Sequence, residues 1–171
     1  MTKFPQKPNF IIDDATKIAT LQEDHFTSVK LWFGMKLNVL IKAGFKFDGA
    51  SVPIDKLNKS KAAEWACKII AKHYPGKDYK ETLAYLIGEP FEMPRLLAAI
   101  VHDALYGLKW KCRWLCDNVY RRILCKAKYD EVRLVIEYSG IRLFGGDNWD
   151  AVTKKEKIET KKLVEAKLTY A

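Results

Sequence analysis

The chain has 171 residues, 49% of them hydrophobic and 30% charged, a composition that excludes disordered and collagen-like proteins and suits one globular domain. Its 30 lysines and arginines against 21 acidic residues give a net charge of +9, which favours acidic partners such as nucleic acid, anionic lipid or acidic protein. No segment is apolar enough to span a membrane or to act as a signal peptide. We therefore expect a protein that stays in the cytoplasm.

The first third of the chain predicts β structure. A short apolar run at residues 10–12 suits a first strand, and between residues 27 and 47 the hydrophobic side chains recur at every second position. Gly34 and Gly44 stand where this pattern breaks, so two or three antiparallel strands are expected. The segment 48–53, Asp-Gly-Ala-Ser-Val-Pro, then ends the strand as a shaped loop.

Helical periodicity dominates the remainder of the chain. The expected helices cover residues 60–72, 79–87, 95–106, 113–128, 130–139, with a stop at Gly140, and 151–171. The sequence thus predicts an α+β fold in which a small antiparallel sheet packs against a mainly helical C-terminal two-thirds. Residues 1–150 are expected to form one α+β domain, and residues 151–171 a charged C-terminal helix with a capping box at Thr153 and Glu156.

Ionisable residues interrupt the most apolar of these helices. His102 and Tyr106 are four positions apart and share a face, while Asp103 points about 100° away from them. The next helix places Arg113, Asp117 and Tyr120 on one face. If the two faces meet, His102 can act as a general base on water and Asp117 can fix its tautomer.

The same residues have a structural interpretation. Buried ionisable groups need partners, and His102, Asp117, Arg113 and the tyrosines could satisfy one another in a network that only locks two helices together. Because the sequence shows no nucleophile and no oxyanion hole, the spacings alone leave both interpretations open.

Two motifs together resemble a known family. The segment 44–53, Gly-Phe-Lys-Phe-Asp-Gly-Ala-Ser-Val-Pro, and the segment 102–106, His-Asp-Ala-Leu-Tyr, resemble a family of phage and prophage proteins known only as a domain of unknown function. The resemblance covers about residues 41–149. It implies a phage or prophage origin, a place in the cytoplasm of the bacterial host or in the virion, and other virion proteins as partners.

Residues 102–117 are also similar to the catalytic helices of small secreted phospholipases A2. That local likeness implies that His102 is the base that activates water, Asp103 a calcium ligand and Asp117 the orienting acid. Asp48 or the loop that follows it could complete the calcium site. Tyr106 joins the expected catalytic group, and Ser51, Arg113 and Tyr120 are the candidate binding residues.

Our leading hypothesis is a phage-encoded His/Asp hydrolase-like protein with an ester-type or anionic substrate. The alternative is a non-enzymatic virion or morphogenesis protein in which the His-Asp cluster is a buried scaffold. Two weaker alternatives are a metal phosphohydrolase that uses His73, and a nucleic-acid-binding protein. The latter would use basic residues interleaved with aromatic ones over residues 107–133, which hold eight of the lysines and arginines.

Overall fold

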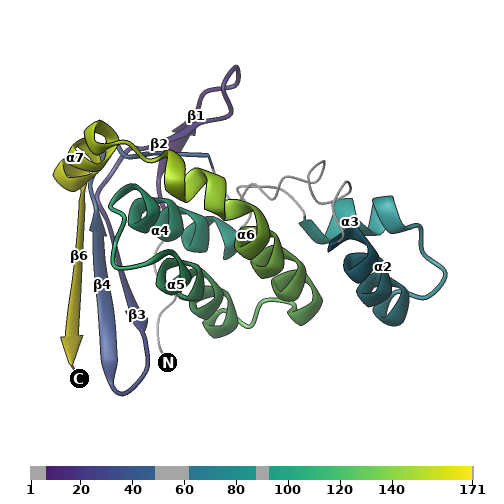
Figure 1. Ribbon diagram of the computed structural model, residues 1–171. Helices are drawn as coiled ribbons and strands as arrows, with labels where there is room; N and C mark the ends of the chain where they lie inside the picture. The colour runs from purple at the N-terminus through teal and green to yellow at the C-terminus, as the bar shows by residue number, and fades with distance from the viewer. Residues whose placement is uncertain (1–6, 49–61, 88–92, 171) are drawn as a thin grey trace.

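A computed structural model describes residues 7–48, 62–87 and 93–170 of the chain. Within these residues the chain forms two three-stranded antiparallel sheets and six helices, with the helices mainly in the C-terminal part (Figure 1). The predicted α+β fold class is therefore confirmed. None of the described helices combines the length and the apolar character needed to cross a bilayer.

The two sheets are built from short antiparallel strands. The first has the order β1 (Phe10–Ile12), β2 (Ala19–Leu21) and β5 (Lys46–Phe47). The second has the order β3 (His25–Lys30), β4 (Met35–Ile41) and β6 (Val164–Tyr170). In β3 and β4 alternate side chains are buried, as the period-two pattern predicts.

The helices are α2 (Ala62–His73), α3 (Tyr79–Ile87), α4 (Arg95–Gly107), α5 (Arg113–Lys126), α6 (Glu131–Ala151) and α7 (Lys154–Leu163). Helix α4 is buried along most of its length and shares the main core with α5 and both sheets. A smaller core joins α2 and α3 to α6 through Ile70, Leu83, Leu86 and Ile136. In Figure 1 the α2–α3 pair lies on the far side of α6 from the sheets.

A fully buried ion pair ties α4 to α6. The Arg95 Nε atom lies 3.2 Å from Glu137 Oε1, and both side chains are shielded from solvent. The Glu137 carboxylate also accepts hydrogen bonds from the Tyr120 and Tyr129 hydroxyl groups, both at 2.8 Å. Burial raises the pKa of Glu137, so these donors stabilise a charge that would otherwise be costly to bury.

The C-terminal segment differs from the expectation of one charged helix over residues 151–171. The predicted capping box begins α7, but the helix ends at Leu163 and β6 follows. Val164, Ala166 and Leu168 pair with residues of β4, the central strand. The alternation of apolar and polar residues here is too short to be recognised next to the lysine-rich helix. The segment becomes a strand because it pairs with β4.

Helix α6 also departs from the sequence prediction, because it continues through Gly140 to Ala151. Glycine is a poor helix former, yet two glycines here permit close packing. A Cβ atom on Gly145 would lie 2.8 Å from the Tyr106 hydroxyl oxygen, and one on Gly146 would lie 3.2 Å from an Arg113 nitrogen. The predicted stop at Gly140 is therefore wrong, because tertiary packing holds the helix together.

We predict that Gly145→Ala destabilises the protein by about 1–2 kcal/mol, because the cost of overpacking against Tyr106 exceeds the gain in helix propensity. Gly146→Ala, which meets only the flexible end of Arg113, is the matched control and should cost less. Chemical denaturation measures both. The cost of Gly145→Ala should shrink in a Tyr106→Phe background, which removes the obstructing hydroxyl; an unchanged cost would contradict this contact.

Candidate active site

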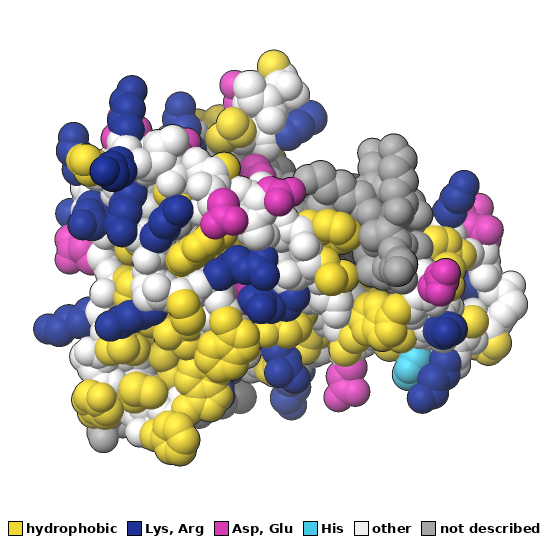
Figure 2. Space-filling view, in the orientation of Figure 1, with side chains coloured by type: hydrophobic (Ala, Val, Ile, Leu, Met, Phe, Trp, Pro, Cys, Tyr) yellow, Lys and Arg dark blue, Asp and Glu magenta, His cyan; other side chains and the backbone are white. Residues whose placement is uncertain are grey.

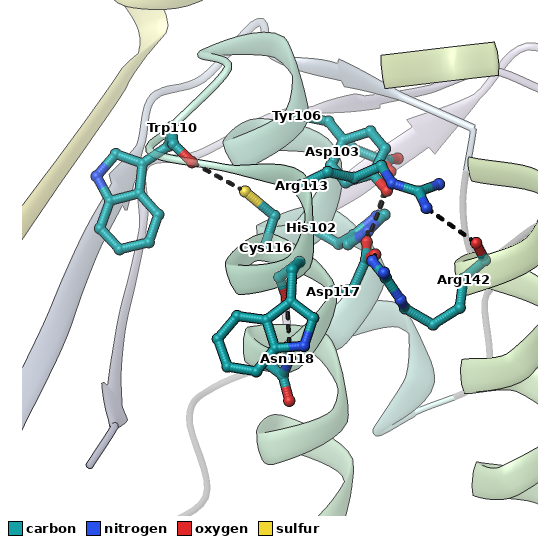
Figure 3. A network of polar contacts seen from close by, with 10 residues as sticks. His102, Asp103, Tyr106, Trp110, Arg113, Cys116, Asp117, Asn118 and Arg142 are labelled. Atoms are coloured by element: carbon teal, nitrogen blue, oxygen red, sulfur yellow. Dashed lines mark hydrogen bonds and ion pairs between the residues drawn. The ribbon is translucent and has the colours of Figure 1, made fainter. Parts of the chain in front are cut away.

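The carboxylate of Asp117 on α5 is the centre of a buried polar network (Figure 3). The side chain is completely buried. Its Oδ1 atom lies 2.9 Å from His102 Nε2 and accepts a hydrogen bond of 2.6 Å from the Tyr106 hydroxyl. Its Oδ2 atom accepts a hydrogen bond from Arg142 on α6. Asp117 thus joins groups from α4 and α6 to α5.

These contacts fix the protonation state of Asp117. Burial alone would raise its pKa, but the hydrogen bonds from His102, Tyr106 and Arg142 lower it below the ordinary value. An ionised carboxylate only accepts hydrogen bonds, so the His102 Nε2 atom must carry a proton. In neutral His102 the lone pair is therefore on Nδ1.

The Nδ1 side of His102 faces a second carboxylate. Nδ1 lies 3.6 Å from Asp103 Oδ1, beyond a direct hydrogen bond but within the span of a bridging water. The ring is held by Tyr106, with centroids 4.0 Å apart, and by an edge contact with Tyr120. Desolvation would lower the pKa of His102, but Asp103 and Asp117 together raise it.

His102 and Asp103 line a cavity of about 780 Å³. Its wall combines the end of α4 with the strand and turn around β5, the second half of α6 and one face of α7. The cavity is large enough for a small-molecule substrate. The ionisable side chains that line it, besides the tyrosines, are Lys46, Asp48, His102, Asp103, Glu156 and Glu159.

The carboxyl groups of Asp48 and Asp103 lie together in this wall. Partial desolvation, followed by the charge of Asp103 and a hydrogen bond with it, raises the pKa of Asp48 to about 7. The two residues expected as metal ligands therefore come together. They are only two side chains, however, and the described residues contain no group of three His, Cys, Asp or Glu side chains suited to a metal. Calcium takes six to eight oxygens, so the described side chains do not form a calcium site.

The three candidate binding residues have different positions. Ser51 lies outside the described residues. Arg113 donates a hydrogen bond from Nη2 to the Arg142 carbonyl oxygen at 3.0 Å, and so supports α6 rather than lining the cavity. Tyr120 is among the residues that line the cavity, and its hydroxyl donates a hydrogen bond to Glu137.

The other candidate residues lie away from the cavity. His73 is exposed at the end of α2 and does not line the cavity with His102. The lysines and arginines of residues 107–133 are also absent from the cavity wall. Among the described residues, the lysine or arginine that lines the cavity is Lys46. The basic side chains of this segment therefore do not line the cavity, although Arg113 lies beside the network through its hydrogen bond to Arg142.

Arg142 is the member of the network that the sequence does not reveal as a site residue. The predicted helix ends before it, and only the continuation of α6 past Gly140 places its guanidinium on Asp117. The available signal in the sequence is an isolated cation, Arg142, that precedes Gly145 by three residues and Gly146 by four. If Gly145 and Gly146 are interpreted as sites of close helix packing and not as a helix end, the helix continues through Arg142 and Arg142 is expected beside α4 and α5.

We predict that Asp48→Asn stabilises the protein more as the pH rises. Since the folded-state pKa of Asp48 is raised to about 7, its contribution to stability is fully present below the ordinary pKa of 3.8 and is lost as the pH rises through about 7. Asparagine can still donate a hydrogen bond to Asp103 but never acquires the charge. The Tm difference between variant and wild type should grow between about pH 4 and about pH 7, the interval between the two pKa values, and level off at higher pH. Asp14→Asn, at a carboxylate that is 97% exposed, is the control, and a pH-independent difference for Asp48→Asn would contradict the prediction.

Comparison of the chain with protein-family models gives no match, and searches of curated proteins and of solved structures give none either.

Proposed function

We propose that the cavity is a hydrolytic site in which His102 takes a proton from water and the resulting nucleophile attacks a carboxylic ester. The observation that carries this proposal is the asymmetric environment of the imidazole. The Nε2 atom is hydrogen-bonded to Asp117, while Nδ1 faces Asp103 in the wall of a substrate-sized cavity. A histidine with one nitrogen fixed by a carboxylate and the other directed towards a cavity suits general base catalysis.

The proposed reaction needs no covalent enzyme intermediate. A water held between His102 Nδ1 and Asp103 gives one proton to Nδ1, and its oxygen forms a bond to the ester carbonyl carbon while the carbonyl π pair moves onto the carbonyl oxygen. Asp103 and Asp117 stabilise the imidazolium that forms. The pair on that oxygen then re-forms the carbonyl as the carbon–oxygen bond to the alkoxide breaks, and Nδ1 gives its proton to the alkoxide. The products are a carboxylic acid and an alcohol, and His102 returns to its neutral form.

The residues around His102 have supporting roles in this mechanism. Asp117 orients the imidazole, and Tyr106 and Arg142 hold Asp117 in place by hydrogen bonds. These are positioning residues because they act through Asp117. The cavity wall carries four carboxyl groups and Lys46, a charge balance that favours a neutral ester over an anionic substrate.

The second candidate function is structural, and the network itself favours it. Asp117 connects three helices and is completely buried, which is also expected of a scaffold. In this second proposal the protein is phage-encoded, as the resemblance of its sequence motifs implies, and works in the host cytoplasm or within the virion, bound to other virion proteins. The following experiment separates the two functions.

His102→Gln should reduce hydrolysis by about 10²–10⁴-fold while the protein stays folded, because the amide cannot act as a base. A panel of p-nitrophenyl esters with short and long acyl chains measures the rate, and thermal unfolding measures stability. His73→Gln, the same change at an exposed histidine on α2, should alter neither. If the wild type hydrolyses no ester in the panel, or if folded His102→Gln keeps the wild-type rate, the hydrolase proposal is wrong and the scaffold stands.

Asp117→Asn should shift the pH dependence of kcat/KM as well as lower it. The rate requires neutral His102, so it rises with pH through the pKa of His102, which Asp117 helps to raise. Removing this charge lowers the pKa of His102, and the rising limb should move to lower pH. A limb that stays in place or moves to higher pH would show that Asp117 does not act on the titrating base.

A further inference from the structure

An exposed aromatic surface lies at the turn between β3 and β4. Phe33 stands at the apex of this hairpin and is 96% exposed. Tyr170, at the end of β6, pairs with Met35 and is 81% exposed. Trp114, on the first turn of α5, is half-exposed and stacks on Trp32 with ring centroids 5.7 Å apart. We call Trp32, Phe33, Trp114 and Tyr170 the aromatic tip.

The backbone of the tip holds Phe33 away from the protein. Phe33 and Gly34 both have a positive φ, +51° and +73°. Asn, Asp and Gly are the residues that such turns favour, and a bulky side chain is uncommon in this region. The turn therefore accepts an unfavourable residue, and the phenyl ring buries nothing within the described part of the chain.

Basic side chains surround the aromatic tip. Lys30 and Lys36 are directly opposite each other on neighbouring strands, an arrangement of like charges that destabilises a sheet. The Arg122 guanidinium lies 4.3 Å from the Trp32 ring centroid and donates to the carbonyl oxygens of Lys30 and Leu31. Repulsion between the two lysines would be relieved by an anionic partner.

Acidic side chains are absent from the segments that form the tip. Residues 25–47 contain no Asp or Glu, and residues 166–170 contain none either. Between residues 107 and 129 the single acidic residue is Asp117, which is completely buried. In Figure 2 hydrophobic side chains gather at the lower left, over the strand ends and α5 of Figure 1, with lysines and arginines at their border.

We propose that the aromatic tip docks on an anionic lipid surface, with Phe33 inserted among the headgroups and Lys30 and Lys36 against their phosphates. Aromatic side chains favour the boundary between headgroups and acyl chains, and basic residues gain energy near anionic lipid. Single-stranded nucleic acid fits less well, because it requires free ring faces for stacking. Trp32 and Trp114 cover each other and Arg122 lies over Trp32, so only Phe33 and Tyr170 of the four tip rings are largely exposed, at the hairpin apex and at the end of β6.

The test is co-sedimentation of the full chain with vesicles of phosphatidylglycerol and phosphatidylcholine, compared with phosphatidylcholine alone. We expect binding to the anionic vesicles only, weakened by added salt. Phe33→Asn suits the positive φ and removes the ring, and it should weaken binding about tenfold or more. Lys30→Gln/Lys36→Gln should weaken it by a similar factor.

Matched control variants on α7 test whether the loss of vesicle binding is specific to the aromatic tip. Ile158→Asn removes an apolar side chain that is 59% exposed on α7, and Lys154→Gln/Lys155→Gln removes two exposed lysines of that helix. Both should bind as the wild type does, and thermal unfolding should show that every variant is folded. Failure to bind anionic vesicles, equal weakening by the control variants, or binding to a single-stranded oligonucleotide without binding to vesicles would each overturn the proposal.

Discussion

The buried carboxylate of Asp117 is the constraint on which the arrangement of the three central helices depends. Removing an ionised carboxylate from water costs several kcal/mol unless hydrogen-bond donors replace the water. The donors are His102 and Tyr106 from α4 and Arg142 from α6. Helix α6 passes close to α4 at this contact, and Gly145 removes a Cβ atom that would crowd the Tyr106 hydroxyl. The helix packing and the charge on Asp117 therefore require each other.

This constraint also prepares the chemistry of His102. A carboxylate fixed on Nε2 leaves Nδ1 to interact with whatever occupies the cavity, and Asp103 supplies a second acceptor on that side. The same two acids that raise the pKa of His102 would stabilise its imidazolium during proton transfer. A network that stabilises the fold thus has the asymmetry that a catalytic base needs.

The charges of the molecule are divided between two regions. The protein carries a net charge of +9, yet acidic groups predominate among the charged side chains that line the cavity. Lys30, Lys36 and Arg122 instead surround the aromatic tip. Net charge alone would suggest an anionic substrate, whereas the positions of the charges support a neutral substrate in the cavity and an anionic surface at the tip.

Features that depend on local spacing could be predicted from the sequence. The i, i+4 spacing of His102 and Tyr106 placed both on one face of α4, and that face meets Asp117. Features that depend on contacts between distant segments could not be predicted. A glycine normally disfavours a helix, so the passage of α6 through Gly140 to Arg142 required knowledge of its neighbours. Strand β6 likewise exists because β4 offers an edge to pair with.

The most direct test of this account is an NMR titration of the His102 imidazole in the wild type and in Asp117→Asn. The chain has three histidines, so assignment is simple, and nitrogen shifts report both the tautomer and the pKa. We expect a His102 pKa above the ordinary value of 6.5, a neutral form protonated on Nε2, and a lower pKa in Asp117→Asn. A neutral form protonated on Nδ1, or a pKa unaffected by Asp117→Asn, would contradict it.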